Sequence, residues 1–129
     1  MKKKFTLQQL EMMQRHFAQI MEKELPFKLT YKLAKIGKQI DSEMATYGSV
    51  RDKMLDKYGE KDDEGRLKID ANRVAIRKDS IETFAKEINE ILASEVELVF
   101  DPLTLDDFNQ MDNIKGTHLM VMQEFMNEG

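Results

Sequence analysis

The feature that most limits how this chain can fold is an apolar stripe that extends from residue 27 to residue 58. Its members recur every three or four positions, which is the spacing of one face of an α-helix. They are Leu29, Leu33, Ile36, Ile40, Met44, Tyr47, Val50 or Arg51, Met54 and Tyr58. The predicted helix is about 48 Å long at 1.5 Å per residue. A stripe of that length needs other helices, or a second copy of itself, to cover it.

Shorter amphipathic helices are predicted on both sides of the long one. The first begins after Thr6, which forms a capping box with Gln9, and ends near Lys23. Pro26 then separates it from the long helix. Another begins at residue 79, where Asp79 can form a capping box with Glu82. The two apolar stripes are Leu10, Met13, Phe17, Ile20 and Met21, and then Ile81, Phe84, Ile88, Ile91 and Leu92.

A period of two residues replaces the helical period between residues 67 and 76. Apolar and basic side chains alternate over residues 66–69, and Val74 and Ile76 lie between Arg73 and Arg77. Residues 70–73 can turn between the two runs, which predicts a β-hairpin. Residues 96–100 read as a further strand that stops at Pro102. Because two strands alone are marginally stable, we expect this third strand to join them in an antiparallel sheet.

The C-terminal part of the chain is rich in methionine. Thr104 and Asp107 form a capping box, which predicts a short helix to about Met111 and then a loop over residues 112–117. Thr117 is expected to cap a last helix. Its apolar residues can either pack in the core or form an adaptable surface for a protein partner or another subunit. These candidate partner-binding residues are Leu119, Met120, Met122, Phe125 and Met126.

Together these elements predict one domain over residues 1–129, of the α+β class and mostly α-helical. The long helix packs with two or three shorter helices, beside a small antiparallel sheet of about three strands. The chain has no cysteine, so it offers no disulfide framework and no thiol nucleophile, which agrees with a cytosolic protein. No apolar run approaches the roughly 18–20 residues of a membrane span, so no membrane association is expected.

The net charge of −4 hides an uneven distribution along the chain. Residues 1–58 contain 12 Lys or Arg and 7 Asp or Glu, which gives a net charge of +5. Residues 59–129 contain 8 and 17 respectively, which gives −9. A basic first half and an acidic second half can pair between copies, or can meet two different partners. We therefore expect a homo-oligomer that also has a protein partner.

The stretch from Lys57 to Asp70 contains the acidic residues and the central glycine of a calcium-binding loop, but not the full pattern. With Gly65 at the sixth position of an EF-hand loop, Ala71 stands where the bidentate glutamate is required. A strand pattern, and not a helix, follows. The stretch is therefore predicted to be an acidic turn, and no metal-binding residue is assigned.

Nothing in the sequence predicts catalysis. His16 and His118 belong to no zinc-binding pattern, and the six glycines form no nucleotide-binding motif. Carboxylates such as Asp106 and Asp107 have no nucleophile or phosphate-binding loop near them in the sequence. We therefore expect a protein that is not an enzyme, with no catalytic residue, no cofactor-binding residue and no cofactor.

A lysine stripe on the long helix is a candidate contact for nucleic acid. Lys28, Lys32, Lys35 and Lys38 fall on one side of the helix and could bind phosphates. Aromatic residues that could stack on bases are few in this region. A lysine stripe opposite an apolar stripe is also typical of a solvated helix face, so nucleic-acid binding is the less favoured reading.

Two segments of the chain resemble small proteins of unknown function encoded by phages and prophages. They are "KYGEKDDEG", which follows a long lysine-rich helix, and "ILASEVELVFDPLTLDDF", which leads to a short C-terminal helix. The resemblance extends in pattern over about the last two-thirds of the chain. It implies a phage origin and action in the cytoplasm of an infected bacterial host, and it transfers no catalytic residue.

Three binding functions fit these observations. The first is a non-enzymatic phage accessory protein that acts through protein–protein interaction or self-assembly, with a host protein as one kind of partner. The second is an inhibitor of a host defence protein that uses the acidic C-terminal half as a nucleic-acid mimic. The third is direct nucleic-acid binding through the lysine stripe. Clustering of the acidic half on one exposed face would distinguish the second from the others.

Overall fold

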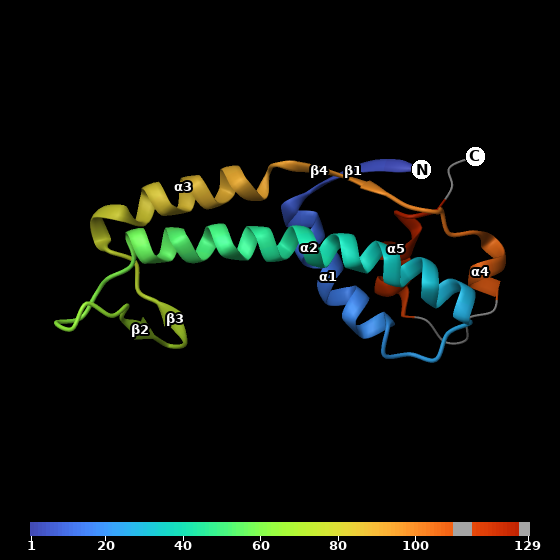
Figure 1. Ribbon diagram of the computed structural model, residues 1–129, viewed down its shortest axis with the longest axis horizontal. Helices are drawn as coiled ribbons and strands as arrows, with labels where there is room; N and C mark the ends of the chain where they lie inside the picture. The colour runs from blue at the N-terminus through green and yellow to red at the C-terminus, as the bar shows by residue number, and fades with distance from the viewer. Residues whose placement is uncertain (110–114, 127–129) are drawn as a thin grey trace. The chain divides into compact units, whose positions relative to one another are not determined.

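The apolar stripe of residues 27–58 folds as one continuous helix, α2 (Phe27–Tyr58), with the predicted bounds (Figure 1). The computed structural model describes residues 1–109 and 115–126. The chain forms two units: unit 1 consists of Met1–Met44 and Glu95–Gly129, and unit 2 consists of Ala45–Ser94. The boundary between the units therefore falls within α2.

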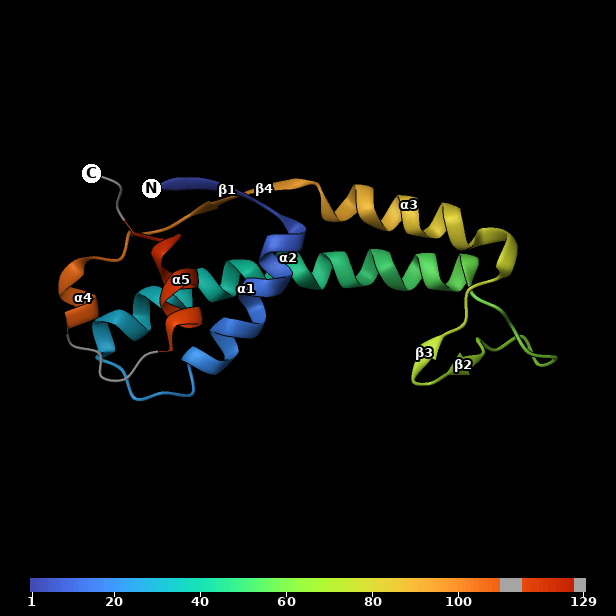
Figure 2. The ribbon, with the colours of Figure 1, turned by 180° about the vertical axis from the view of Figure 1, so that it is seen from behind.

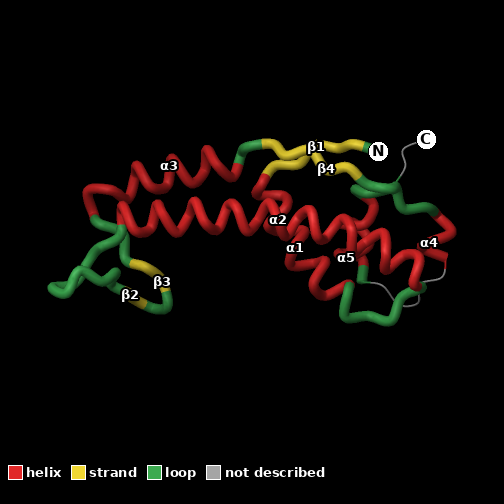
Figure 3. Tube along the Cα trace, viewed as in Figure 1, coloured by secondary structure: helices red, strands yellow, loops and turns green. Residues whose placement is uncertain are grey.

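Unit 1 combines a two-stranded sheet with helices. Its elements are β1 (Lys2–Thr6), α1 (Leu7–Ile20), residues 27–44 of α2, β4 (Glu95–Val99), α4 (Leu105–Asn109) and α5 (Gly116–Gln123). The two strands pair antiparallel and lie side by side in Figure 3, with Lys2 opposite Val99 and Thr6 opposite Glu95. Gln39 on α2 forms hydrogen bonds with both backbone groups of Val99 in β4. Its side-chain amide donates to the Val99 carbonyl at 2.7 Å and accepts from the Val99 N–H at 3.1 Å.

The core of unit 1 is built around the ring of Phe125. Its centroid lies 5.3 Å from that of Phe5, 5.6 Å from that of Phe17 and 5.1 Å from that of Phe100. Tilted and edge-on arrangements at such distances are favourable for aromatic rings. The aliphatic residues of the α1 and α2 stripes complete this core, and the fully buried ones are Leu10, Ile20, Leu29, Leu33, Ile36 and Ile40.

Unit 2 is a helical pair with a small hairpin. It contains residues 45–58 of α2, β2 (Ile69–Asp70), β3 (Arg73–Val74), the 3₁₀ turn η1 (Lys78–Ser80) and α3 (Ile81–Leu92). In both views α3 lies along the second part of α2 (Figures 1 and 2). The Tyr58 hydroxyl donates to the Glu87 carboxylate at 3.0 Å, and the Tyr58 ring meets Phe84 edge-on at 6.2 Å.

The predicted fold class is confirmed: the chain is α+β and mostly helical. The predicted three-stranded sheet is wrong. Residues 96–100 do not join the hairpin, because β4 pairs with β1, so that the described residues form two sheets of two strands each. In β1 only Phe5 is buried, and three consecutive lysines hide its alternation from a reading of the sequence. The prediction of a single domain stays a prediction.

The predicted capping residues are confirmed at two of four helix starts. Thr6 with Gln9, and Thr104 with Asp107, form reciprocal capping hydrogen bonds. The capping predictions for Asp79 and Thr117 are wrong, because α3 begins after η1 with Ser80 as its N-cap, and α5 begins two residues earlier than expected, with Lys115 as its N-cap. The predicted end of the short helix at Met111 lies outside the described residues.

Candidate interaction surfaces

The most exposed apolar helix face in unit 2 belongs to α3. This helix has a strongly one-sided apolar stripe, yet none of its twelve residues, all of which the structure describes, is buried. Ile81 is 52% exposed. Phe84, Ile88, Ile91 and Leu92 are half-buried. Because a helical pair covers each helix from one side only, part of the apolar face of α3 is open to solvent.

A second apolar surface lies in unit 1, in a groove between α1 and α2. The groove has a volume of about 610 Å³, and its floor is formed by the buried residues Phe17 and Leu33. Small residues on its walls, Ala18, Ala34 and Gly37, leave the hollow open. Its rim carries Met21, Lys38 and Asp41.

The helices on the two sides of this groove are joined by a polar contact. The Gln14 side chain on α1 donates to the Asp41 carboxylate on α2 at 2.8 Å. A Cβ atom at Gly37 would lie 3.5 Å from the Phe17 ring, which is an ordinary contact. The small residue there is therefore not required for helix packing, although it deepens the groove.

Two exposed aromatic residues continue the groove toward the start of α2. Phe27 is 92% exposed and Tyr31 is 65% exposed. Together with Ala34 and Lys38 they are spaced by four, three and four residues, so they lie on one face of the helix. The Lys35 ammonium lies 5.3 Å from the Tyr31 ring centroid. Exposed aromatic side chains beside an apolar groove are typical of an interaction site.

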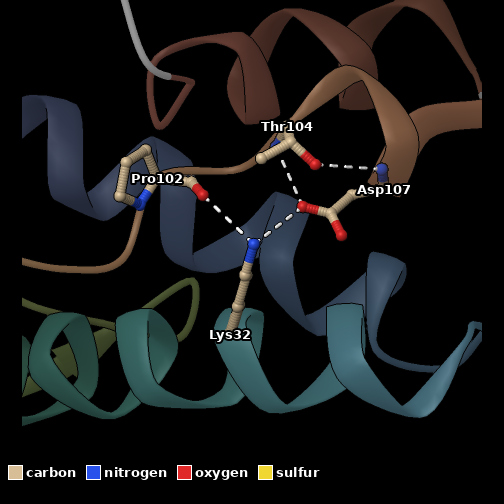
Figure 4. A network of polar contacts seen from close by, with 4 residues as sticks. All are labelled: Lys32, Pro102, Thr104 and Asp107. Carbon is tan, nitrogen blue, oxygen red and sulfur yellow. Dashed lines mark hydrogen bonds and ion pairs between the residues drawn. The ribbon is translucent and has the colours of Figure 1, made fainter.

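The predicted lysine stripe is reduced by an internal ion pair. The Lys32 ammonium lies 3.0 Å from Asp107 Oδ2 and donates to the Pro102 carbonyl at 3.2 Å (Figure 4). The same Asp107 oxygen accepts from the Thr104 backbone N–H at 2.8 Å. Lys28, Lys35 and Lys38 are exposed. Lys32 therefore holds the segment before α4 against α2 and is not available to a phosphate.

The charge of Asp107 is favoured by its partners. Burial raises the pKa of its carboxyl, but the Thr104 backbone N–H and the Lys32 ammonium together outweigh burial and lower that pKa below the ordinary value of 3.8. Asp107 is thus held as an anion whose hydrogen bonds are made within unit 1.

The proposed C-terminal surface must be corrected. Met122 and Phe125 are fully buried in unit 1 and cannot contact a partner. Met126 is half-buried and forms an isolated β-bridge with Leu103. Leu119 and Met120 are 36% and 69% exposed. The error arises because the apolar residues surround α5, so sequence spacing does not tell which side is buried.

The two histidines, 102 residues apart in sequence, meet in unit 1. His16 on α1 and His118 on α5 face each other through their Nδ1 atoms at 3.2 Å. His118 is 2% exposed. Burial, followed by the charges of Lys23, His16 and Lys115, lowers the pKa of His118 below 6.5. One Nδ1 must be unprotonated to accept the hydrogen bond, so this contact requires at least one neutral ring.

The acidic stretch forms a turn, as predicted. The Asp62 carboxylate accepts from the backbone N–H groups of Glu64 and Arg66 at 2.9 and 3.0 Å. Gly65 has a φ of 79°, which favours glycine. The hairpin turn is also confirmed, since Ala71 and Asn72 both have positive φ, as in a two-residue hairpin loop.

The chain matches no protein-family model, no curated protein and no solved structure. No helix among the described residues is long and apolar enough to cross a membrane. A proposal of function therefore rests on the surfaces themselves.

Proposed function

We propose that this protein acts by binding, without catalysis, and that it self-associates through the apolar face of α3. The observation that carries the proposal is the exposure of this face: the helix has an apolar stripe, but no residue of it is buried in its own chain. Burying one isoleucine or phenylalanine side chain completely is worth about 1.5–3 kcal/mol. A second chain that covers five such incompletely buried side chains would therefore form a substantially stabilised complex.

The charge distribution supports a second copy as the partner. Residues 1–58 have a net charge of +5 and residues 59–129 have −9. Two copies can therefore place basic and acidic regions against each other, and closed symmetric dimers are the commonest assemblies of identical chains. Complementary charge increases the rate of such an encounter and selects its orientation.

The phage origin and the action in an infected bacterial cytoplasm are kept as part of this proposal, on the resemblance of the two quoted segments. Self-assembly is favoured over nucleic-acid binding because Lys32 is engaged by Asp107, which leaves three exposed lysines on the stripe. The acidic-mimic hypothesis stays a prediction.

The proposal is tested by changing one exposed residue of the apolar face. Ile81→Glu places a charge on that face, and Ile81 is exposed in the first turn of α3, where an acidic residue favours the helix. Thr83→Glu is the matched control, because it adds the same charge in the same turn at an exposed position outside the apolar stripe.

Light scattering during size-exclusion chromatography gives the readout. The unchanged protein and the Thr83→Glu variant are expected to have a mass of at least twice 15.1 kDa. The Ile81→Glu variant is expected at 15.1 kDa with unchanged helical circular dichroism. An unchanged protein that stays at 15.1 kDa on concentration contradicts self-association, and an Ile81→Glu variant that keeps the larger mass contradicts the role of α3.

A further inference from the structure

We infer that the receiving surface for α3 is the groove between α1 and α2 in unit 1 of a neighbouring copy. This inference rests on the proposed self-association and names the second side of its contact. It differs from the packing of α3 against α3, in which the groove would have no part. The argument depends on the shape, the length and the charge of the two surfaces.

Shape favours the match between an apolar helix and this groove. The groove has an apolar floor, Phe17 and Leu33, and small walls at Ala18, Ala34 and Gly37. Such a hollow accepts the side chains along one face of a helix, which is a recurring mode of helix recognition. The apolar face of α3 supplies branched and aromatic side chains at spacings of three and four residues.

The two surfaces also agree in length. The twelve residues of α3 extend for about 18 Å at 1.5 Å per residue. The receiving face of α2 begins at Phe27 and ends at Asp41, which is about 22.5 Å by the same measure. The exposed Phe27 and Tyr31 lie within this length and provide apolar area beyond the hollow itself.

Charge selects an acidic helix for this face. The receiving face, residues 27–41, contains four lysines and one acidic residue, Asp41 on the groove rim. Lys28, Lys35 and Lys38 are exposed, whereas Lys32 is paired with Asp107. Residues 81–92 contain Glu82, Glu87 and Glu90 against Lys86, so α3 has a net charge of −2. Opposite charges at the rim of an apolar contact orient the partners and disfavour like surfaces. Two α3 helices facing each other would lack this complementarity.

The contact joins two different surfaces, and the smallest closed assembly that satisfies both is a reciprocal pair. In a closed pair, α3 of each copy lies in the groove of the other, and the two contacts are related by a two-fold axis. Each copy then contributes one groove and one helix. This arrangement predicts that a variant with an altered groove can pair with a variant with an altered α3. Packing of α3 against α3 does not predict this.

The groove is tested with Ala34→Glu. Ala34 is exposed on the groove wall, and a glutamate there fills the hollow, repels α3 and can pair with Lys38 one turn later, so α2 stays folded. Ala45→Glu is the matched control, because it makes the same change at an exposed position on the same helix outside the groove. Ala18→Glu, on the α1 wall, is the second variant should Ala34→Glu fail to fold.

We expect Ala34→Glu to reduce the mass to 15.1 kDa and Ala45→Glu to keep the larger mass. Mixing the Ala34→Glu and Ile81→Glu variants should restore pairs, because the mixture contains one intact α3 and one intact groove. Loss of pairing in Ile81→Glu but not in Ala34→Glu or Ala18→Glu would overturn the groove and leave self-association standing. A mixture that stays at 15.1 kDa up to the solubility limit would also overturn it.

Discussion

At the scale of single residues, two glycines of unit 2 have opposite roles that their sequence context does not reveal. Gly48 lies within α2, and an added Cβ would meet no atom within 4 Å. Gly59 follows α2, and a Cβ there would lie 2.5 Å from the Leu55 carbonyl oxygen and 2.6 Å from a methyl group of Leu67. The backbone passes too close at Gly59 for any side chain.

Alanine at these two positions should therefore have opposite effects. Gly48→Ala is expected to raise the free energy of unfolding by about 0.5–1 kcal/mol, because alanine loses less conformational freedom in a helix. Gly59→Ala is expected to lower it by about 1–3 kcal/mol through overpacking. Urea denaturation followed by circular dichroism measures both. A destabilised Gly48→Ala variant would show that this position has a contact which the structure lacks.

The pKa of His118 makes stability depend on pH. Because this pKa is lowered by folding, the folded state binds fewer protons than the unfolded state. The stability contributed by neutral His118 is complete above pH 6.5, the ordinary value, and is lost as the pH falls below it. Unit 1 should therefore be less stable at about pH 5 than at about pH 8.

Urea denaturation at the two pH values checks this expectation. A His118→Gln variant retains a polar side chain but cannot titrate, so its difference in unfolding free energy between the two pH values should be smaller. Asp107 does not confuse the result, because its contribution is present above pH 3.8 and is lost only below it. Equal pH dependence in the variant and the unchanged protein would remove His118 as the cause.

At the scale of elements, the sequence predicted the helices that have a regular apolar period and missed the strand that is stabilised by pairing with a distant part of the chain. The stripe of α2 and the break at Pro26 set its bounds correctly, since the helical period is a local property. β1 was missed because its pairing with β4 joins residues almost a hundred positions apart and leaves only Phe5 buried. The same holds for the candidate site. The apolar stripe of α3 could be predicted from the sequence, but its exposure and the groove between α1 and α2 could not, because both depend on how the helices pack.

The position of α4 depends on the ion pair between Lys32 and Asp107, whose side chains are 14% and 9% exposed. Asp107→Asn is expected to destabilise unit 1 by about 1–3 kcal/mol, because it leaves a nearly buried ammonium without its anion. Lys35→Met is the control for the helix, since Lys35 is exposed and its loss should cost little.

A double-mutant cycle with Lys32→Met separates the ion pair from the other contacts of Asp107. The two changes together should cost less than the sum of the single changes, because the second removes a charge that the first left unpaired. Additive effects in urea denaturation would show that the ion pair does not contribute to stability.

At the scale of the whole molecule, each of the two units has one apolar surface that its own chain leaves exposed. Unit 1 has an apolar groove beside the exposed lysines of α2, and unit 2 has an apolar face on α3, a helix of net charge −2. Neither surface was evident from the charge totals alone, although these totals indicated pairing between copies. Met122 of α5 and Phe125, which follows the helix, belong to the core of unit 1, which is one of the two roles that the sequence left open for the C-terminal apolar residues.

The central claim is that α3 of one copy contacts the groove of another, and crosslinking between two single-cysteine variants tests it most directly. The chain has no cysteine of its own, so Ile81→Cys and Ala34→Cys each introduce one reactive group. The two variants are made with tags of different mass, mixed, and treated with a short bismaleimide. We expect the mixed product, Ile81→Cys joined to Ala34→Cys, to exceed both products of identical chains. A predominant product between two Ile81→Cys chains, or no crosslinked dimer, would contradict it.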